Sequence, residues 1–233
     1  MPFPYTFPLV WGQQFIIEVD WNNNGSYADA NEDISTDVQS MRWRRGRDTE
    51  LDRGIPGSAE LTLQNDTGKY SPDNTGSPLS GNLLPSRPLR IRAQEPVSRT
   101  MFTGYIEDII PNPNPMEKTC YIRAVDGAAQ VLSHKIVRTL MRTNYLTGTA
   151  IGEVLDAANW AAGLRALDAG KSSMNNWWLH DDKALDAIQK LEEAEQGFLY
   201  VRNDGYAVFE DRHHRIQGPH LTPKASINAT MIG

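Results

Sequence analysis

Hydrophobic and polar residues alternate with a period of two in several short stretches of the first 125 positions. Between residues 59 and 64, for example, Ala59, Leu61 and Leu63 are separated by polar neighbours, which is the pattern of a strand with one buried face. The same pattern predicts strands over residues 15–20, 37–47, 59–64, 89–93, 101–109 and 119–125. Short strands at such close spacing are typical of a small antiparallel β-barrel or sandwich.

The hydrophobic period changes to that of a helix after residue 126. A first helix is predicted by apolar side chains at positions i, i+3, i+4 and i+7, namely Ile151, Val154, Leu155 and Ala158. Thr147 or Thr149 is its expected N-cap. A second helix is expected to begin with Asp181 or Asp182 as its cap and to end with Gly197 as its C′ residue.

The period of two then returns. Asn203-Asp204-Gly205 lies between two apolar stretches, 198–202 and 206–210, and this is a strong signal for a β-hairpin. The fold class predicted is therefore α+β and mainly β. An antiparallel β-barrel-like domain with an N-terminal arm occupies residues 1–133, and a small domain of two helices and a hairpin occupies residues 134–215.

A last alternation, at residues 224–233, has no partner strand after it in this chain. A lone strand with an apolar face invites pairing. We assign residues 216–233 to the start of a further strand or second barrel. We expect either that the sequence is the N-terminal part of a longer polypeptide, which we favour, or that this segment joins a sheet of another chain.

A long segment rich in Gly, Asn, Ser and Pro separates two predicted strands at residues 68–88. Loops of this length are uncommon in compact domains and often form contact surfaces. Ordering each residue costs about 1–2 kcal/mol of backbone entropy, so an ordered loop must pack on something. We therefore expect this loop and the arm at residues 1–11 at subunit contacts, with Tyr70, Leu83, Leu84 and Arg87 as interface candidates.

A basic cluster surrounds Trp43 on the predicted strand at residues 37–47. Basic residues interleaved with an aromatic side chain can bind nucleic acid, but acidic residues follow at once. We favour ion pairs within the chain or between subunits. The interface candidates of this region are Arg42, Arg44, Arg45, Arg47, Glu50 and Asp52.

Composition narrows the range of functions. The net charge of −6 gives the whole chain no attraction for nucleic-acid phosphates. The single cysteine, Cys120, excludes an internal disulfide and lies in a strand pattern, so we expect a small buried side chain. The uncharged N-terminus is interrupted by Pro2, Pro4 and Pro8, which argues against a signal peptide or a membrane span.

Two groups of polar residues resemble sites of chemistry. Asp20, Asn22, Asn24 and Gly25 match the start of a calcium loop, but the twelfth position is Asn31, with Glu32 one residue late. The flanks also have the pattern of strands, so an Asn-Gly turn is the interpretation we favour. His213-His214, with Glu210, Asp211 and His220 nearby, lack the spacing of a metal site.

Trp177-Trp178 could stack on sugar rings, with Trp160 close in the sequence. Adjacent residues of a strand face opposite ways, so packing in the core between the helices is favoured. The chain also lacks the spacings of a serine hydrolase elbow, a phosphate-binding loop or a dinucleotide-binding loop. We predict no catalytic residues, no metal and no cofactor.

Several stretches carry a family resemblance in a fixed order. They are RGRDTELD, GSAELTLQNDTGKYSP, NLLPSRPLRIRA and MFTGYIEDI, followed by CYIRAVDGAAQVL, TAIGEVLDAANW and ALDAIQKLEEAEQGFLYVRNDGYAVFEDR. The resemblance extends over roughly residues 15–215. They resemble tail-tip and baseplate-hub proteins of tailed bacteriophages, often labelled minor tail proteins.

The resemblance implies a structural virion protein and not an enzyme. Such a protein would be made in the host cytoplasm and placed at the distal end of the tail. It would form a ring, as a homotrimer, and join a distal tail or tube protein to a central fibre or spike protein. It would line part of the DNA path without binding DNA specifically, and it would not insert into a membrane.

The alternative is a tail component that binds or cleaves carbohydrate on the host surface. That function would need an exposed aromatic platform or a pair of carboxylates in a groove. If the chain is instead a hub, we expect a neutral or acidic lumen, because fixed Lys and Arg would bind phosphates. The arginines of residues 42–47 should then lie at an interface or on the outer wall.

Overall fold

The computed structural model describes residues 15–46, 55–94, 97–114, 116–217 and 221. Contacts divide the chain into two compact units. The first is Met1–His134 together with Tyr200–Tyr206, and the second is Lys135–Leu199 together with Ala207–Gly233. The sequence placed a boundary between residues 133 and 134, and it placed the whole hairpin in the second domain.

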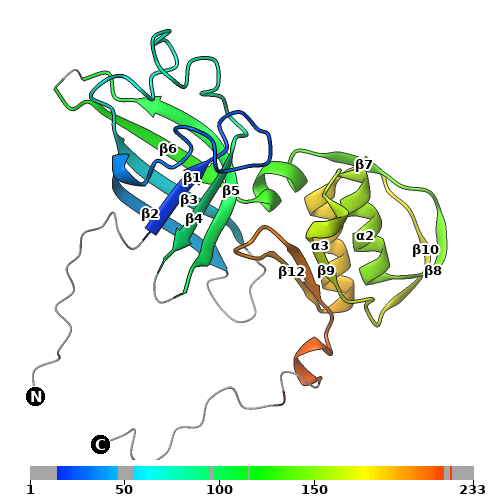
Figure 1. The fold of residues 1–233 in the computed structure, drawn as a ribbon. Helices are drawn as coiled ribbons and strands as arrows, with labels where there is room; N and C mark the ends of the chain where they lie inside the picture. Colours follow the sequence, from blue (N-terminus) through cyan, green and yellow to red (C-terminus); the bar gives the residue numbers. More distant parts are fainter. Residues whose placement is uncertain (1–14, 47–54, 95–96, 115, 218–220, 222–233) are drawn as a thin grey trace, which may run out of the picture. The chain divides into compact units, whose positions relative to one another are not determined.

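The first unit is built on a six-stranded sheet with the order β1-β4-β5-β6-β3-β2, which curls into a half-barrel (Figure 1). Every ladder between these strands is antiparallel. The strands are β1 Phe15–Val19, β2 Val38–Gly46, β3 Ile55–Gln64, β4 Pro88–Ala93, β5 Arg99–Pro111 and β6 Thr119–Val125. The predicted strands and the mainly β fold class are confirmed.

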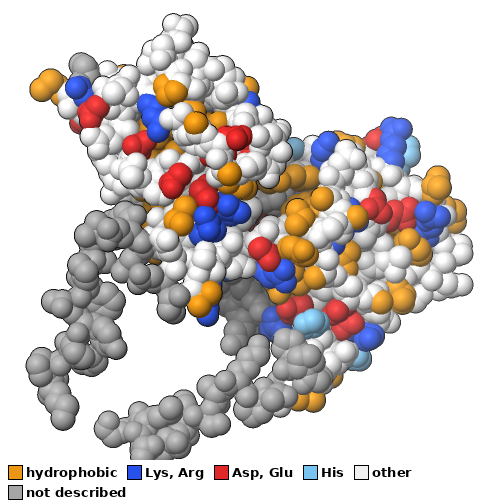
Figure 2. All heavy atoms as spheres, in the orientation of Figure 1, with side chains coloured by type: hydrophobic (Ala, Val, Ile, Leu, Met, Phe, Trp, Pro, Cys, Tyr) orange, Lys and Arg blue, Asp and Glu red, His pale blue; other side chains and the backbone are white. Residues whose placement is uncertain are grey.

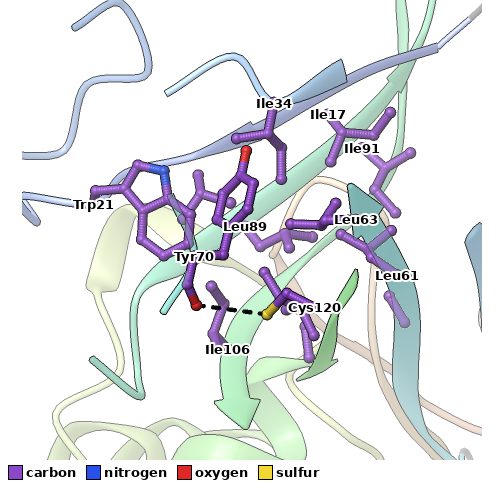
Figure 3. Packing of buried hydrophobic residues seen from close by; sticks show 14 of the residues in the cluster. Ile17, Trp21, Ile34, Leu61, Leu63, Tyr70, Leu89, Ile91, Ile106 and Cys120 are labelled. Carbon is purple, nitrogen blue, oxygen red and sulfur yellow. Dashed lines mark hydrogen bonds between the residues drawn. The ribbon is translucent and has the colours of Figure 1, made fainter. Parts of the chain in front are cut away.

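The core of the first unit follows from the alternation in the sequence. In the β3–β6 ladder, Leu61 lies opposite Ile122 and Leu63 lies opposite Cys120, and all four side chains are buried. Figure 3 shows Leu61, Leu63 and Cys120 converging with Trp21, Ile34 and Tyr70 inside the curled sheet. Burial of one face per strand is the main stabilising contribution, at about 25 cal/mol per Å² of apolar surface.

Cys120 is a buried side chain, as expected. Its Sγ lies 3.7 Å from the backbone oxygen of Tyr70, the contact marked by the dashed line in Figure 3. Burial raises the pKa of the thiol to about 12, so the nucleophilic thiolate is suppressed.

The second unit contains two helices, α2 Thr147–Ala157 and α3 Ala184–Glu195, which pack side by side (Figure 1). Short strands surround them, in the sheets β10-β8, β11-β7 and β12-β13-β9. Their bounds are β7 Ile136–Arg138, β8 Arg142–Leu146, β9 Arg165–Leu167, β10 Ser173–Trp177, β11 His180–Lys183, β12 Phe198–Val201 and β13 Ala207–Glu210. The two helices and the β12–β13 hairpin were predicted.

The predicted helix caps were wrong. Thr147 and Thr149 lie inside α2, whose N-cap is Leu146, and the Thr147 hydroxyl donates instead to Glu195 Oε2 at 2.6 Å. Asp181 and Asp182 belong to β11. Neither residue caps α3, because residues 180–183 pair with β7 before the helix begins.

The end of α3 differs from the prediction in a similar way. The left-handed residue is Gln196, with φ 55°, not Gly197. Glycine is required at 197 for another reason, since a Cβ there would come within 2.6 Å of the Glu210 backbone oxygen. Gly197 therefore allows the chain leaving α3 to pass close to β13.

Five strands of the second unit, β7 to β11, were not predicted, and one pairing has an unexpected direction. Strand β9 pairs with β13 in parallel, with Ala166 opposite Val208. Strands of three to five residues with polar side chains carry little periodic signal.

Candidate interaction surfaces

Strand β2 is one end of the six-stranded sheet. The alternation along it places Met41 and Trp43 toward the core and Arg42 and Arg44 on the opposite face. At the other end of the sheet, β1 is covered by the segment that precedes η1 (Ser35–Asp37), because Ile34 donates its backbone N–H to Ile17 at 2.9 Å. Edge strands with accessible backbone groups are sites for pairing with another chain.

The structure brings three of the predicted arginines together on β2. Arg42 approaches Glu60 of β3 at 3.9 Å, and its side chain is 81% exposed. Such an exposed pair contributes little stability, about 0–1 kcal/mol. Arg45 lies beside Gly57. Arg47 lies outside the described residues.

Two further members of that candidate group, Glu50 and Asp52, also lie outside the described residues. The expected ion pairs between the arginines and the acidic residues that follow them are therefore not described. Arg42 has an acidic partner on the neighbouring strand instead, across the β2–β3 ladder.

The long loop at residues 68–88 packs on its own unit. A chain of tight turns folds it, with backbone bonds such as Ser71 to Gly68 and Asn74 to Ser71. Tyr70 and Leu83 are buried in the core. This burial corrects the prediction that Tyr70 and Leu83 are interface residues, because neither side chain is available at a surface.

Two candidates in this loop remain accessible. Leu84 is 49% exposed. Arg87 is partly exposed, and its Nε donates to the backbone oxygen of Asn82 at 3.2 Å. Contact of these residues with another subunit stays a prediction.

An exposed apolar cluster in the second unit was missed by the sequence analysis. Leu140, Met141 and Trp178 are 71%, 64% and 55% exposed. The β7–β11 and β8–β10 ladders bring residues 139–141 opposite residues 178–179, and Thr139 donates to the Leu179 oxygen at 3.1 Å. The three side chains are thus exposed on two segments that lie opposite each other, and exposed apolar side chains are a feature of contact surfaces.

The tryptophans do not form a paired platform. Trp177 is buried and stacks on Tyr145, with ring centroids 5.7 Å apart. Trp178 faces solvent, and Trp160 is buried with its Nε1 donating to the Leu164 oxygen at 3.0 Å. Core packing, as predicted, accounts for Trp177 and Trp160 but not for Trp178.

An open hollow of about 430 Å³ lies in the second unit, lined by residues that include Tyr145, Gly148 and Leu167. Its charged side chains have polar partners. Arg142 contacts Glu153 at 3.0 Å, and Asp168 contacts His214 Nδ1 at 2.7 Å. These partners give the carboxylates a structural role.

The histidine cluster has a similar explanation. His214 lies between Asp168 and Glu210, which is 3.9 Å from its Nε2. His220 lies outside the described residues. Within the described ranges, no group of three or more His, Cys, Asp and Glu side chains is placed to hold a metal ion. The helices there include none that is long and apolar enough to cross a membrane.

Comparison with known proteins gives a consistent result at the level of fold. No family model matches the sequence. No curated protein sequence matches it either. Solved structures do match. The 43 kDa tail protein of prophage MuSo2 from Shewanella oneidensis has a TM-score of 0.53 and 12% identity, over 84% of this chain and 53% of that chain.

The tail protein from Neisseria meningitidis MC58 has a TM-score of 0.52 and 13% identity, over 84% of this chain and 50% of that chain. The chain thus spans about half the length of these two tail proteins. At such identities the likeness concerns the fold alone. The chain shares its fold with these two phage tail proteins, as its resemblance to tail-tip and baseplate-hub proteins predicted.

Proposed function

We propose that this chain is a structural component of a phage tail tip or baseplate hub, where it joins the tail tube to a central fibre or spike. The observation that carries the proposal is the shared fold with two tail proteins over 84% of the chain. The chain contributes to the assembled structure of the tail and does not catalyse a reaction. The protein acts in the virion, at the distal end of the tail, after synthesis in the host cytoplasm.

Copies of the chain form a ring, as a homotrimer. The edge strand β2 is well suited to a subunit contact, because its outer face carries Arg42 and Arg44 while its inner face is anchored in the core. Charged edges favour a defined partner over uncontrolled sheet extension.

The exposed cluster of Leu140, Met141 and Trp178 provides a second contact surface, toward a neighbouring tail component. Aromatic and methionine side chains are enriched at protein interfaces. The partners are a distal tail or tube protein on one side and a central fibre or spike protein on the other.

The ring lines part of the path of the genome without binding it specifically. A net charge of −6 is compatible with this passage. Figure 2 shows acidic and basic side chains interspersed over the visible face of the described residues, and no large field of one sign. Arg42 and Arg44 should lie at an interface or on the outer wall, because a lumenal ring of arginines would hold phosphates.

Deletion of the gene tests the proposed function. Lysates of the deletion strain should contain filled heads without complete tails in electron micrographs, and the wild-type gene supplied in trans should restore them. Antibody labelling should mark the distal end of complete tails. Complete, infectious tails in the deletion lysate would contradict the proposal.

The two contact surfaces can be tested separately. Purified protein should show three times the mass of one chain at micromolar concentration, and Arg42→Glu with Arg44→Glu should reduce that association. The triple change of Leu140, Met141 and Trp178 to Ser should leave the ring intact but prevent restoration of tails. Met116→Ser is the matched control, because Met116 is an exposed residue of the first unit.

The carbohydrate alternative makes a different prediction. A carbohydrate-active tail component would release sugar from host-surface polysaccharide or bind it in a sedimentation assay, whereas a hub should do neither. In the described residues, Trp178 is exposed without Trp177 beside it on the same face, so this function has weaker support.

A further inference from the structure

The loop after β1 is folded by its own side-chain oxygens. Asp20, which is buried, accepts backbone N–H groups from Asn24 at 3.0 Å and from Gly25 at 2.8 Å. Asn22 Oδ1 accepts the same Asn24 N–H at 3.1 Å. Gly25, with φ +83°, allows the sharp turn that these bonds require.

Side chains from both halves of the loop meet at Asp29. Asn22 Nδ2 and Asn24 Nδ2 lie 2.8 and 2.6 Å from Asp29 Oδ2. The backbone N–H of Asp29 donates to Glu32 Oε2 at 2.8 Å. The Glu32 carboxylate therefore contacts the loop through Oε2.

Glu32 Oε1 is a buried oxygen without a hydrogen-bond partner, and the residue is only 1% exposed. Burial raises the pKa of Glu32, and the nearby carboxylates of Asp29, Asp20 and Glu18 raise it further. Glu18 has its own cations, with Arg90 at 2.9 Å and Arg92 at 2.7 Å. A buried carboxylate oxygen with no partner is costly, and a cation would compensate it.

We propose that the loop at residues 20–32 binds a calcium ion. The donors are oxygens of five side chains: Asp20, Asn22, Asn24, Asp29 and Glu32. Carboxylate and amide oxygens suit a hard cation, and an oxygen that accepts one hydrogen bond keeps a second lone pair. The amide nitrogens of Asn22 and Asn24 point at Asp29, so both amides must turn over to present their oxygens to the ion. Calcium tolerates six to eight ligands in irregular geometry, whereas magnesium requires a near-ideal octahedron.

The one-residue offset that counted against a calcium loop is resolved by the backbone. Asn31 adopts a left-handed conformation, with φ 68°, and its backbone oxygen accepts a bond from Trp21 Nε1 at 3.1 Å. The next residue, Glu32, then faces Asp29 in place of Asn31. The three carboxylates among these donors do not form a ready-made metal group in the described part of the chain, so the loop must draw them together around the ion.

Calcium binding should couple to the stability of the first unit. Glu32 is both a donor and a partner of β1, because its backbone oxygen accepts the Val19 N–H at 2.9 Å. A ligand that binds only the folded chain raises its unfolding temperature in proportion to the logarithm of the ligand concentration. The ion would therefore hold the covering segment against the edge of β1.

Titration calorimetry and thermal unfolding of the full chain, at constant ionic strength, test the site with CaCl2, MgCl2 or EDTA. The expected result is one calcium per chain, with a dissociation constant of about 10⁻⁴–10⁻³ M as in extracellular modules. The unfolding temperature should rise with calcium and respond much less to magnesium. Terbium should bind in place of calcium, with luminescence sensitised by Trp21.

Variants separate calcium binding from a structural role of the loop. Glu32→Gln should weaken calcium affinity at least about tenfold, yet in EDTA it should unfold at the same temperature as wild type or higher, because a buried charge is removed. Glu107→Gln, on β5 and paired with Arg123 at 3.0 Å, is the matched control and should bind calcium normally.

Two results would overturn the site. One is the absence of any saturable calcium response of the wild type at 10 mM, a concentration about tenfold above the weakest expected constant. The other is a calcium response that survives in Glu32→Gln. If Glu32 is neutralised by a proton instead, stability will depend on pH and not on calcium, and this also counts against the proposal.

Discussion

Tyr70 offers the sharpest test of how the long loop is held. Its ring is fully buried beside Trp21, with centroids 6.3 Å apart. Its hydroxyl donates to Asp37 Oδ2 at 2.5 Å, and Lys69 Nζ reaches the same oxygen at 2.8 Å. The side chain therefore links the loop to the segment just before β2.

Two substitutions at Tyr70 divide its contribution. Tyr70→Phe removes a hydrogen bond to a charged group, which is worth about 1.5–3 kcal/mol. Tyr70→Ala also empties the ring's place in the core, and comparable aromatic deletions cost about 3–5 kcal/mol. For a chain of this size, the phenylalanine variant should lower the unfolding temperature by about 3–12 °C.

The phenylalanine variant should also change the response to acid. Burial by itself would raise the pKa of Asp37, but the bonds from Lys69 and Tyr70 hold it below the usual value. A pKa that is lower in the folded state than in the unfolded state stabilises the fold at pH values above the unfolded-state pKa. This contribution is lost as the pH falls through the folded-state pKa. Without the Tyr70 hydroxyl, the loss should begin at higher pH.

Tryptophan fluorescence during thermal unfolding is a suitable assay, because Trp21 lies beside Tyr70. Leu84→Ala is the control from the same loop, and as an exposed site it should change stability by less than about 0.5 kcal/mol. The reasoning is refuted if Tyr70→Ala unfolds like wild type but loses its self-association. Tyr70 would then be a contact between subunits, as the sequence analysis expected.

Three further predictions concern buried groups. Cys120 should not react with a thiol reagent at pH 8 in the native protein, because its pKa is about 12, but should react fully in denaturant. Burial would raise the pKa of Glu195, yet hydrogen bonds from Thr147 and two backbone groups lower it. The second unit should therefore lose stability as the pH falls through the folded-state pKa of Glu195. Thr147→Val should move this loss, measured by circular dichroism, to higher pH. Gly197→Ala should destabilise by about 1–3 kcal/mol in a denaturant titration, because the new methyl group would approach the Glu210 oxygen to 2.6 Å; an unchanged midpoint would show that β13 can move away.

Local sequence determined the half-barrel and the two helices. A strand with one buried face must alternate, and a helix on a core must repeat its apolar residues every three or four positions, so both patterns are present before folding. Leu61 and Leu63 could be assigned to the core from their neighbours alone. The resemblance in order and spacing carried the same prediction to the level of the phage tail fold.

Tertiary structure decided what depends on a distant partner. Strand β9 has three residues and exists because β13, some forty positions later, pairs with it. Tyr70 stands in a polar loop, so no local pattern distinguishes a core anchor from a surface contact. Glu32 is one residue away from a familiar ligand position, and only the left-handed turn at Asn31 brings its carboxylate to the loop. Periodicity records which face of an element is buried, whereas these positions depend on which segments meet.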